Sequence, residues 1–335
     1  MNKEKCGSNQ EWKKQEEQIC PEVHYKIIPS GIMITGCYGT DGQVILPDEI
    51  EGGPVTAIAP YTFAEDRIDE GTLVWTGENA EFTEDRRRIC GSQVTEVWLP
   101  AKVTEIGRYA FYRCRNLRKL ILTDSLLDMG GGALNGCRLS NVEIHFRKGK
   151  KSCLKSIVEE MRYQILAELL YYEENKEARI LFPEHYEEAV ENTPARIVVT
   201  HHHGAGGYYR QCFYNRELDY KKYDEMLYHV VAEEEVQTAV KLVLNRLRFP
   251  FLLGKEAKAA YASYLREHLM EAGRILAESE EIEELKFLSE KEYWTPEALD
   301  EAILAAAEKK KTEILSYLMD EKYKRYPKEK KKFEL

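Results

Sequence analysis

The sequence lacks several features that would assign it to common classes of protein. It has eight cysteines but no C-x-x-C pair, so a zinc or redox motif of that kind is not predicted. No window offers about 18 uninterrupted apolar residues, and no membrane-spanning helix is predicted. The first 15 residues are polar and contain no apolar signal core, so we expect a cytoplasmic, reducing location.

Positive charge is also in deficit. The chain has 48 Lys and Arg against 58 Asp and Glu, a net charge of −10, which disfavours a general nucleic-acid binder. What is present is ordinary for a folded protein: 335 residues, 43% apolar and 32% charged. That length and composition predict two domains or one elongated one.

Internal repeats dominate the first half. An offset of 23 residues aligns two segments at apolar or small positions, and Leu117 then matches Leu139 at 22. The positions matched at 23 are Ile106 with Met129, Ala110 with Ala133, Phe111 with Leu134, and Cys114 with Cys137.

An earlier copy lies upstream. Residues 55–58 match 103–106 at an offset of 48, and Phe63 matches Phe111 at the same offset. This offset leaves room for one divergent copy, and we expect its strand around residues 73–75.

Each copy alternates with a period of two, which predicts a strand with one buried face. The paired apolar positions are Val97 and Leu99, Leu120 and Leu122, and Val142 and Ile144. The residues between them, Trp98, Ile121 and Glu143, should form an exposed ladder on the open face of the sheet, where a partner could bind. Cys114 and Cys137 are predicted to be buried thiols in the core.

These residues resemble BspA-like leucine-rich repeats. The segment from Val94 to Leu122 carries the L-P, I-G and A-F-x-x-C marks of a standard unit, and residues 31–63 are similar to an opening unit. The resemblance implies a β-solenoid over residues 23–150 that follows a polar segment, 1–22. It also implies a surface or interaction protein of bacterial type.

The character of the chain changes after Phe146. Apolar residues at spacings of three and four over 152–170 predict one amphipathic helix that caps the solenoid or, alternatively, offers its stripe to a partner helix. Residues 179–183 and 195–200 are predicted as strands, with a short helix after Pro183 between them. Together they form a predicted connecting region, 151–215.

A helical region is predicted over 216–326. One stripe comprises Val236, Val240, Val243, Leu244 and Leu247, and Pro250 ends that helix. An offset of 30 aligns Leu285 with Leu315 and Leu288 with Leu318. The segment from Thr295 resembles an ankyrin repeat, although Lys310 occupies that family's glycine position, and the resemblance implies protein binding. The basic tail, 327–335, is predicted to be solvated; a nucleic-acid or membrane arm is the alternative.

Motifs for chemistry are weak. Adjacent strand residues point to opposite faces, so of His201, His202 and His203 only the first and third could share a metal, and no site is predicted. The glycines at 204–207 lack the Lys and Ser/Thr of a phosphate loop. A nucleophile built from Cys212 with a histidine, oriented by Asp219, is one further possibility.

An aromatic and basic cluster follows these histidines. Tyr208, Tyr209 and Arg210 are residue types favoured at interfaces, and we treat them as candidate partner contacts. The favoured interpretation, however, is that they pack the junction between the two repeat regions. A ligand cleft would also be expected near such a junction.

Together the patterns predict an α+β fold: a short leucine-rich-repeat β-solenoid followed by an ankyrin-like helical stack. The favoured function is a non-enzymatic protein-interaction module or scaffold without cofactor or metal, binding an unknown protein and neither nucleic acid nor membrane. The alternative is an enzyme or a small-ligand or metal sensor with its site around residues 201–223.

Overall fold

The computed structural model describes residues 20–65, 72–77, 86–192 and 197–327, and within 189–202 it describes the backbone alone. The chain divides into two compact units, residues 1–226 and 227–335. The first contains a β-solenoid and the second is helical, so the expected α+β class is confirmed. Among the described helices, none combines the length and apolarity that crossing a bilayer requires.

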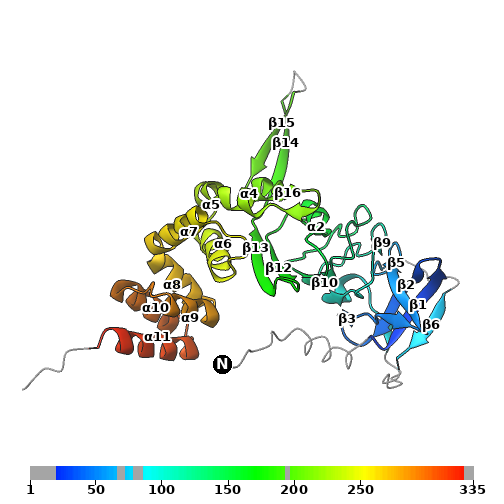
Figure 1. Cartoon of the computed structure of the whole chain (residues 1–335), viewed down its shortest axis with the longest axis horizontal. Coiled ribbons are helices and arrows are strands. Elements are labelled where there is room, and N and C mark those ends of the chain that lie inside the picture. The colour runs from blue at the N-terminus through cyan, green and yellow to red at the C-terminus, as the bar shows by residue number, and fades with distance from the viewer. Residues whose placement is uncertain (1–19, 66–71, 78–85, 193–196, 328–335) are drawn as a thin grey trace, which may run out of the picture. The chain divides into compact units, whose positions relative to one another are not determined.

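A sheet of parallel strands, one per turn, forms the solenoid (Figure 1). Its strands are β3 (Gln43–Ile45), β8 (Glu96–Trp98), β10 (Lys119–Thr123), β11 (Asn141–Phe146) and β12 (Ile165–Tyr171). Strand β13 (Lys176–Phe182) then pairs antiparallel with β12 and ends the sheet. In-register pairing stacks one inward residue per strand into a fully buried column: Val44, Val97, Leu120, Val142 and Ala167.

The core behind this sheet is built from the residues that the 23- and 48-residue offsets align. Phe63 and Phe111 stack with ring centroids 5.0 Å apart. Cys114 and Cys137 are buried free thiols, as predicted. The Cys137 thiol donates a hydrogen bond to the Phe111 carbonyl at 3.0 Å, and Cys114 donates to the Phe63 carbonyl at 3.4 Å. Each thiol therefore ties its own turn to the preceding one.

The predicted helix over 152–170 is wrong in its second half. Helix α2 spans only Leu154–Glu160, and Ile165 and Leu169 belong to β12 instead. A spacing of four residues is compatible with both a helical and a strand period, so the apolar pattern alone could not decide. The segment forms a strand because β12 pairs with β11 along six residues, which buries Ile165, Ala167 and Leu169.

The divergent copy expected between residues 58 and 103 is also absent from the sheet of the solenoid as far as it is described. Strand β5 (Gly53–Ile58) pairs directly with β9 (Glu105–Ile106), with Ile58 opposite Ile106, so the 48-residue offset joins neighbouring turns. The strand predicted at 73–75 exists as β6 (Leu73–Thr76), but it pairs antiparallel with β1 (Glu22–Ile28). That second sheet also contains β2 (Gly31–Gly39), β4 (Glu49–Ile50) and β7 (Arg87–Arg88).

The connecting region contains a hairpin where a helix was predicted. Strand β14 (Tyr186–Asn192) pairs antiparallel with β15 (Ile197–His203) along seven residues, and the ribbon stands apart from the neighbouring strands (Figure 1). The β-branched run at 197–200 favours a strand. The segment after Pro183 forms β14 and supplies the backbone hydrogen bonds for this strand. The unit ends with α3 (Gly206–Arg210), β16 (Phe213–Tyr214), β17 (Glu217–Leu218) and α4 (Tyr220–Glu225).

The second unit consists of helices. They are α5 (Leu227–Glu233), α6 (Val236–Arg248), α7 (Lys255–Glu267), α8 (Leu269–Glu278), α9 (Ile282–Glu290), α10 (Pro296–Glu308) and α11 (Thr312–Arg325). The predicted stripe of α6 is buried except for Val236, and the helix ends before Pro250. Thr295 caps α10 by accepting a hydrogen bond from the Ala298 backbone N–H at 3.2 Å.

The 30-residue offset relates the helix pair α8–α9 to the pair α10–α11. Leu288 and Leu318, aligned by this offset, are both fully buried. Glu280 and Lys310, also 30 apart, both adopt left-handed backbone conformations, with φ values of 60° and 56°, in the turns within each pair. The helix pairs therefore repeat, while the resemblance to ankyrin stays a prediction.

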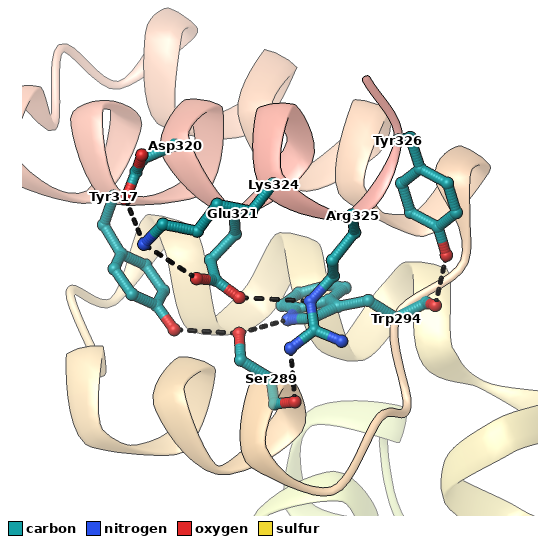
Figure 2. Close-up of polar contacts among 8 residues, drawn as sticks. All are labelled: Ser289, Trp294, Tyr317, Asp320, Glu321, Lys324, Arg325 and Tyr326. Carbon is teal, nitrogen blue, oxygen red and sulfur yellow. Dashed lines mark hydrogen bonds and ion pairs between the residues drawn. The ribbon is translucent and has the colours of Figure 1, made fainter.

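A polar network fastens the last helix to α9 (Figure 2). The Ser289 hydroxyl accepts hydrogen bonds from Trp294 Nε1 at 3.0 Å and from the Tyr317 hydroxyl at 2.8 Å. Arg325 donates to the Ser289 carbonyl at 2.5 Å and pairs with Glu321 at 3.1 Å. Because Trp294 is buried, its indole N–H needs this partner.

Replacing Lys310 by glycine should stabilise the second unit. A left-handed conformation costs an L-residue about 1 kcal/mol and costs glycine almost nothing, so Lys310→Gly should raise the free energy of unfolding by roughly 0.5 kcal/mol after the larger entropy of unfolded glycine is deducted. Lys309→Gly is the matched control, because φ there is −84° and glycine should destabilise. Urea denaturation of both variants measures the difference; equal losses would contradict the interpretation.

Candidate functional site

The outer face of the solenoid sheet carries the predicted ladder. Ile121 lies opposite Trp98 on one side and Glu143 on the other, in register, so these side chains form one row across β8, β10 and β11. Glu168 on β12 continues the row, because it pairs with Glu143. The residues predicted to face the core are buried as expected: Val97, Leu99, Leu120, Leu122, Val142 and Ile144.

The expectation that Ile121 is exposed is wrong. Its side chain is fully buried although it points away from the inward column. Lys119, two residues earlier on the same strand, reaches across the row: its ammonium lies 5.8 Å from the centre of the Trp98 ring and 2.7 Å from Glu143 Oε2. The alkyl stem of a lysine can cover apolar surface while its charge finds a partner. Trp98 and Glu143 keep partial exposure, and Ile121 does not.

A charge network runs along this face. Glu143 receives His145 Nε2 at 2.8 Å in addition to Lys119, and the other ring nitrogen of His145 lies 2.8 Å from the Tyr172 hydroxyl. At the neighbouring strand, Trp98 Nε1 donates to Glu96 Oε1 at 2.5 Å. The outer face is thus ordered by side-chain hydrogen bonds as well as by the strands beneath it.

The network sets the protonation of its members. Burial acts to raise the pKa of Glu143, but the hydrogen bonds and charges of His145 and Lys119 outweigh it and lower this pKa to about 2. Burial likewise opposes the charged form of Lys119, and Glu143 outweighs that effect, so the pKa of Lys119 is raised. Both groups are charged at neutral pH, which suits them to hold a fixed surface pattern.

Of the cluster at 208–210, only Tyr208 has a substantially exposed side chain, at 42%. Tyr209 and Arg210 are buried, which agrees with the packing interpretation, and their candidate role as partner contacts on the surface is wrong. The Arg210 guanidinium donates to four backbone carbonyls: Val158 at 2.9 Å, Met161 at 3.0 Å, Tyr163 at 3.1 Å and Pro183 at 2.6 Å. It therefore satisfies carbonyls at the end of α2 that the helix itself leaves without partners.

The neighbouring aromatic residues pack in the same way. Tyr209 and Tyr223 meet edge to face with centroids 4.7 Å apart, and the Tyr223 hydroxyl donates to the Leu181 carbonyl at 2.6 Å. The Tyr220 hydroxyl lies 2.8 Å from that of Tyr171 on β12. All of these residues lie in the first unit, where they anchor α3 and α4 to the end of the solenoid sheet.

The histidine and glycine motifs bring no ligands together in the part of the chain whose side chains are described. There, no group of three or more His, Cys, Asp and Glu side chains could hold a metal ion. The side chains of His201 and His202 lie outside that part, and His203 stacks on Tyr186 at 4.4 Å. Gly206 serves close packing, since an added Cβ would lie 2.2 Å from the Pro183 carbonyl oxygen.

Cys212 is a poor candidate for a nucleophile. It is fully buried, and burial raises its pKa to about 12. Its thiol donates to the Tyr208 carbonyl at 3.4 Å. At neutral pH it remains protonated, whereas the thiolate is the reactive form.

A row of arginines on the turns was not among the predicted site residues. Arg115 and Arg138 follow Cys114 and Cys137 at the same 23-residue offset, and this spacing was the available signal. The structure places both beside a hollow of about 560 Å³, together with Arg162.

One strand per turn, with columns of buried residues behind the strands, defines the first unit as a β-solenoid of stacked repeats. Residues 88–165 match the sequence profile of the BspA type leucine rich repeat region (6 copies), which supports the predicted resemblance over that part of the chain. No curated protein matches the chain.

The solved structure of the leucine rich repeat protein TpLRR of T. pallidum is similar to part of the chain. The match has 22% identity, a TM-score of 0.21, and covers 39% of this chain and 54% of that chain. The chain thus spans about half of the length of that protein.

Removing the charge of Glu143 should lower stability in a pH-dependent way. A carboxyl whose pKa falls on folding stabilises the folded state above its ordinary pKa of 4.5, and this contribution disappears as the pH falls to about 2. Glu143→Gln should reduce the free energy of unfolding by roughly 1–2 kcal/mol at pH 7, allowing for solvent screening, and by much less at pH 2.5. Urea denaturation at both pH values measures this. Glu49→Gln, in an exposed pair with Lys102, should change little at either.

Arg210 should be among the most sensitive positions of the first unit. Arg210→Leu leaves four backbone carbonyls without their donor, and we expect a loss of about 3 kcal/mol or more in the free energy of unfolding. The exposed neighbour Tyr208→Ala should cost less than about 0.5 kcal/mol. Thermal and urea denaturation of both variants provide the test, and similar losses would refute a structural role for Arg210.

Proposed function

We propose that this chain is a non-enzymatic protein-interaction module that binds a partner protein over the outer face of its solenoid sheet. The observation that carries the proposal is the in-register row across β8 to β12, which holds one outward side chain per turn in a fixed position. Repeat solenoids offer extended surfaces of this kind. The leucine-rich-repeat match over residues 88–165 supports the same class of function.

Within this face, Trp98 is the proposed anchor and Glu143 and Glu168 the proposed polar contacts. Trp98 is partly exposed and its ring is held by the hydrogen bond to Glu96 and by the ammonium of Lys119, so little conformational freedom remains to be lost on binding. Tryptophan is also the residue type that most often dominates protein interfaces. Ile121 contributes indirectly, by filling the space beneath Lys119.

The packing around residues 208–223 favours this proposal over an enzyme or sensor at that place. Tyr209, Arg210 and Cys212 are buried and engaged with backbone carbonyls or rings. The proposal includes a bacterial, cytoplasmic setting, in which the described cysteines, all free thiols, would stay reduced.

Trp98→Ala should weaken binding of the partner by at least tenfold, because a central tryptophan typically contributes 2 kcal/mol or more, roughly, to an interface. The measurement is quantitative recovery of bound proteins from bacterial lysate on immobilised chain. Tyr214→Ala, at a side chain 81% exposed on the β16–β17 hairpin, is the matched control and should leave recovery unchanged.

Folding of both variants is checked by circular dichroism and thermal melting before binding is compared. Equal recovery on folded Trp98→Ala and wild-type chain would remove the sheet face from the proposal. Glu168→Lys, which reverses a charge on the same face, tests this surface a second time without removal of an aromatic ring.

A further inference from the structure

Three arginines stand in successive turns at equivalent places. Arg115, Arg138 and Arg162 each follow a residue whose side chain is buried in the core: Cys114, Cys137 and Met161, respectively. We call these three the arginine column. All three arginines are exposed, whereas the residue before each of them is buried. The repeat that builds the core therefore also places one guanidinium per turn on the surface.

The arginine column lines the hollow of about 560 Å³, which lies within the range of about 300–1,000 Å³ typical of ligand sites. The exposed ring of Tyr163 forms part of the wall, and the Arg138 guanidinium lies 5.9 Å from its centre. Gly132, at φ +71°, also belongs to the lining, and an added Cβ there would lie 2.4 Å from the Tyr109 ring. The hollow thus combines positive charge with an aromatic surface.

The charge of the hollow is unbalanced. Among the described residues, no carboxylate forms an ion pair with Arg115, Arg138 or Arg162. Glu160 is the acid in the lining, and its two oxygens already accept the backbone N–H groups of Gly132 at 3.0 Å and Leu134 at 2.9 Å. Three positive charges thus face one negative charge, on a chain of net charge −10. Like charges held together without partners favour binding of an anion.

We propose that the arginine column binds an extended acidic segment of a partner protein, with its carboxylates on successive guanidinium groups. Neighbouring turns of a sheet lie about 4.8 Å apart, so the charges spread along a line of about 10 Å instead of meeting at one point. A single phosphate is better served by converging donors that include backbone N–H groups. Here Glu160 already occupies the N–H groups of Gly132 and Leu134.

This site is separate from the sheet face of the proposed function. It uses residues of the turns, and none of the Trp98, Glu143 or Glu168 side chains belongs to the lining of the hollow. The two surfaces can therefore be tested one by one in the full chain.

The test measures binding of a fluorescein-labelled ten-residue peptide of alternating Glu and Ala by fluorescence anisotropy. We expect binding that weakens steeply with added salt, because exposed ion pairs are screened. The triple variant Arg115→Gln, Arg138→Gln and Arg162→Gln should bind about tenfold more weakly, and Arg138→Gln alone about threefold. The same peptide with Gln in place of Glu should bind at least tenfold more weakly than the Glu peptide.

Matched controls separate this site from other effects. Arg274→Gln removes an exposed arginine of α8 and should change the affinity less than twofold, as should Trp98→Ala. Because the arginines of the column are exposed, the melting temperature of each variant should equal that of the wild type. Loss of partner recovery in Trp98→Ala with intact peptide binding would show that the two surfaces act independently.

Either of two results would overturn the proposal: equal binding of the Glu peptide by wild type and triple variant, or equal binding of Glu and Gln peptides by the wild type. A third result would overturn the proposed ligand chemistry. If a peptide of the same length with one phosphoserine binds more than tenfold tighter than the Glu peptide, and loses this in the triple variant, the column recognises phosphate and the assignment to carboxylates is wrong.

Discussion

The first unit depends on the in-register pairing of its parallel strands. Because Val97, Leu120 and Val142 lie opposite one another, each turn buries its apolar residues against the same residues of the next. A shift of one residue would turn every inward side chain outward. The same register aligns Trp98, Ile121 and Glu143 on the outer face. The hydrophobic core and the proposed binding face are therefore consequences of one set of backbone hydrogen bonds.

Charged side chains supply hydrogen-bond partners to backbone groups that the strands and helices leave unpaired. Arg210 supplies donors to carbonyls around the end of α2, and Glu160 supplies acceptors to the N–H groups of Gly132 and Leu134. In the second unit the buried Arg246 donates to the Phe251 carbonyl at 3.2 Å. Irregular backbone between regular elements carries unmet hydrogen-bonding groups, and burying them without partners is costly. In both units, charged side chains thus supply partners to the irregular backbone between the regular elements.

Residue types that favour an interface do not by themselves place a residue at one. Tyr209 and Arg210 have the composition of a binding site, yet both are used for packing. Ile121 occupies an outward position, yet it is fully buried in a row that Lys119 spans to reach Glu143. Arg115 and Arg138 directly follow buried cysteines in the repeat, yet both line a hollow. Burial depends on neighbours that are distant in sequence, and periodicity does not report them.

The sequence alone determined the repeat. Offsets of 23, 48 and 30 residues identified the stacked Phe63 and Phe111, the buried thiols and the repeated helix pairs, because equivalent positions in a repeat meet the same surroundings. Tertiary structure decided between helix and strand for residues 161–171 and 184–192. A spacing of four fits both periods, and only a partner strand supplies the ladder of hydrogen bonds. The tertiary structure also decided which charged side chains form ion pairs and which remain exposed, because only the fold brings the partners together.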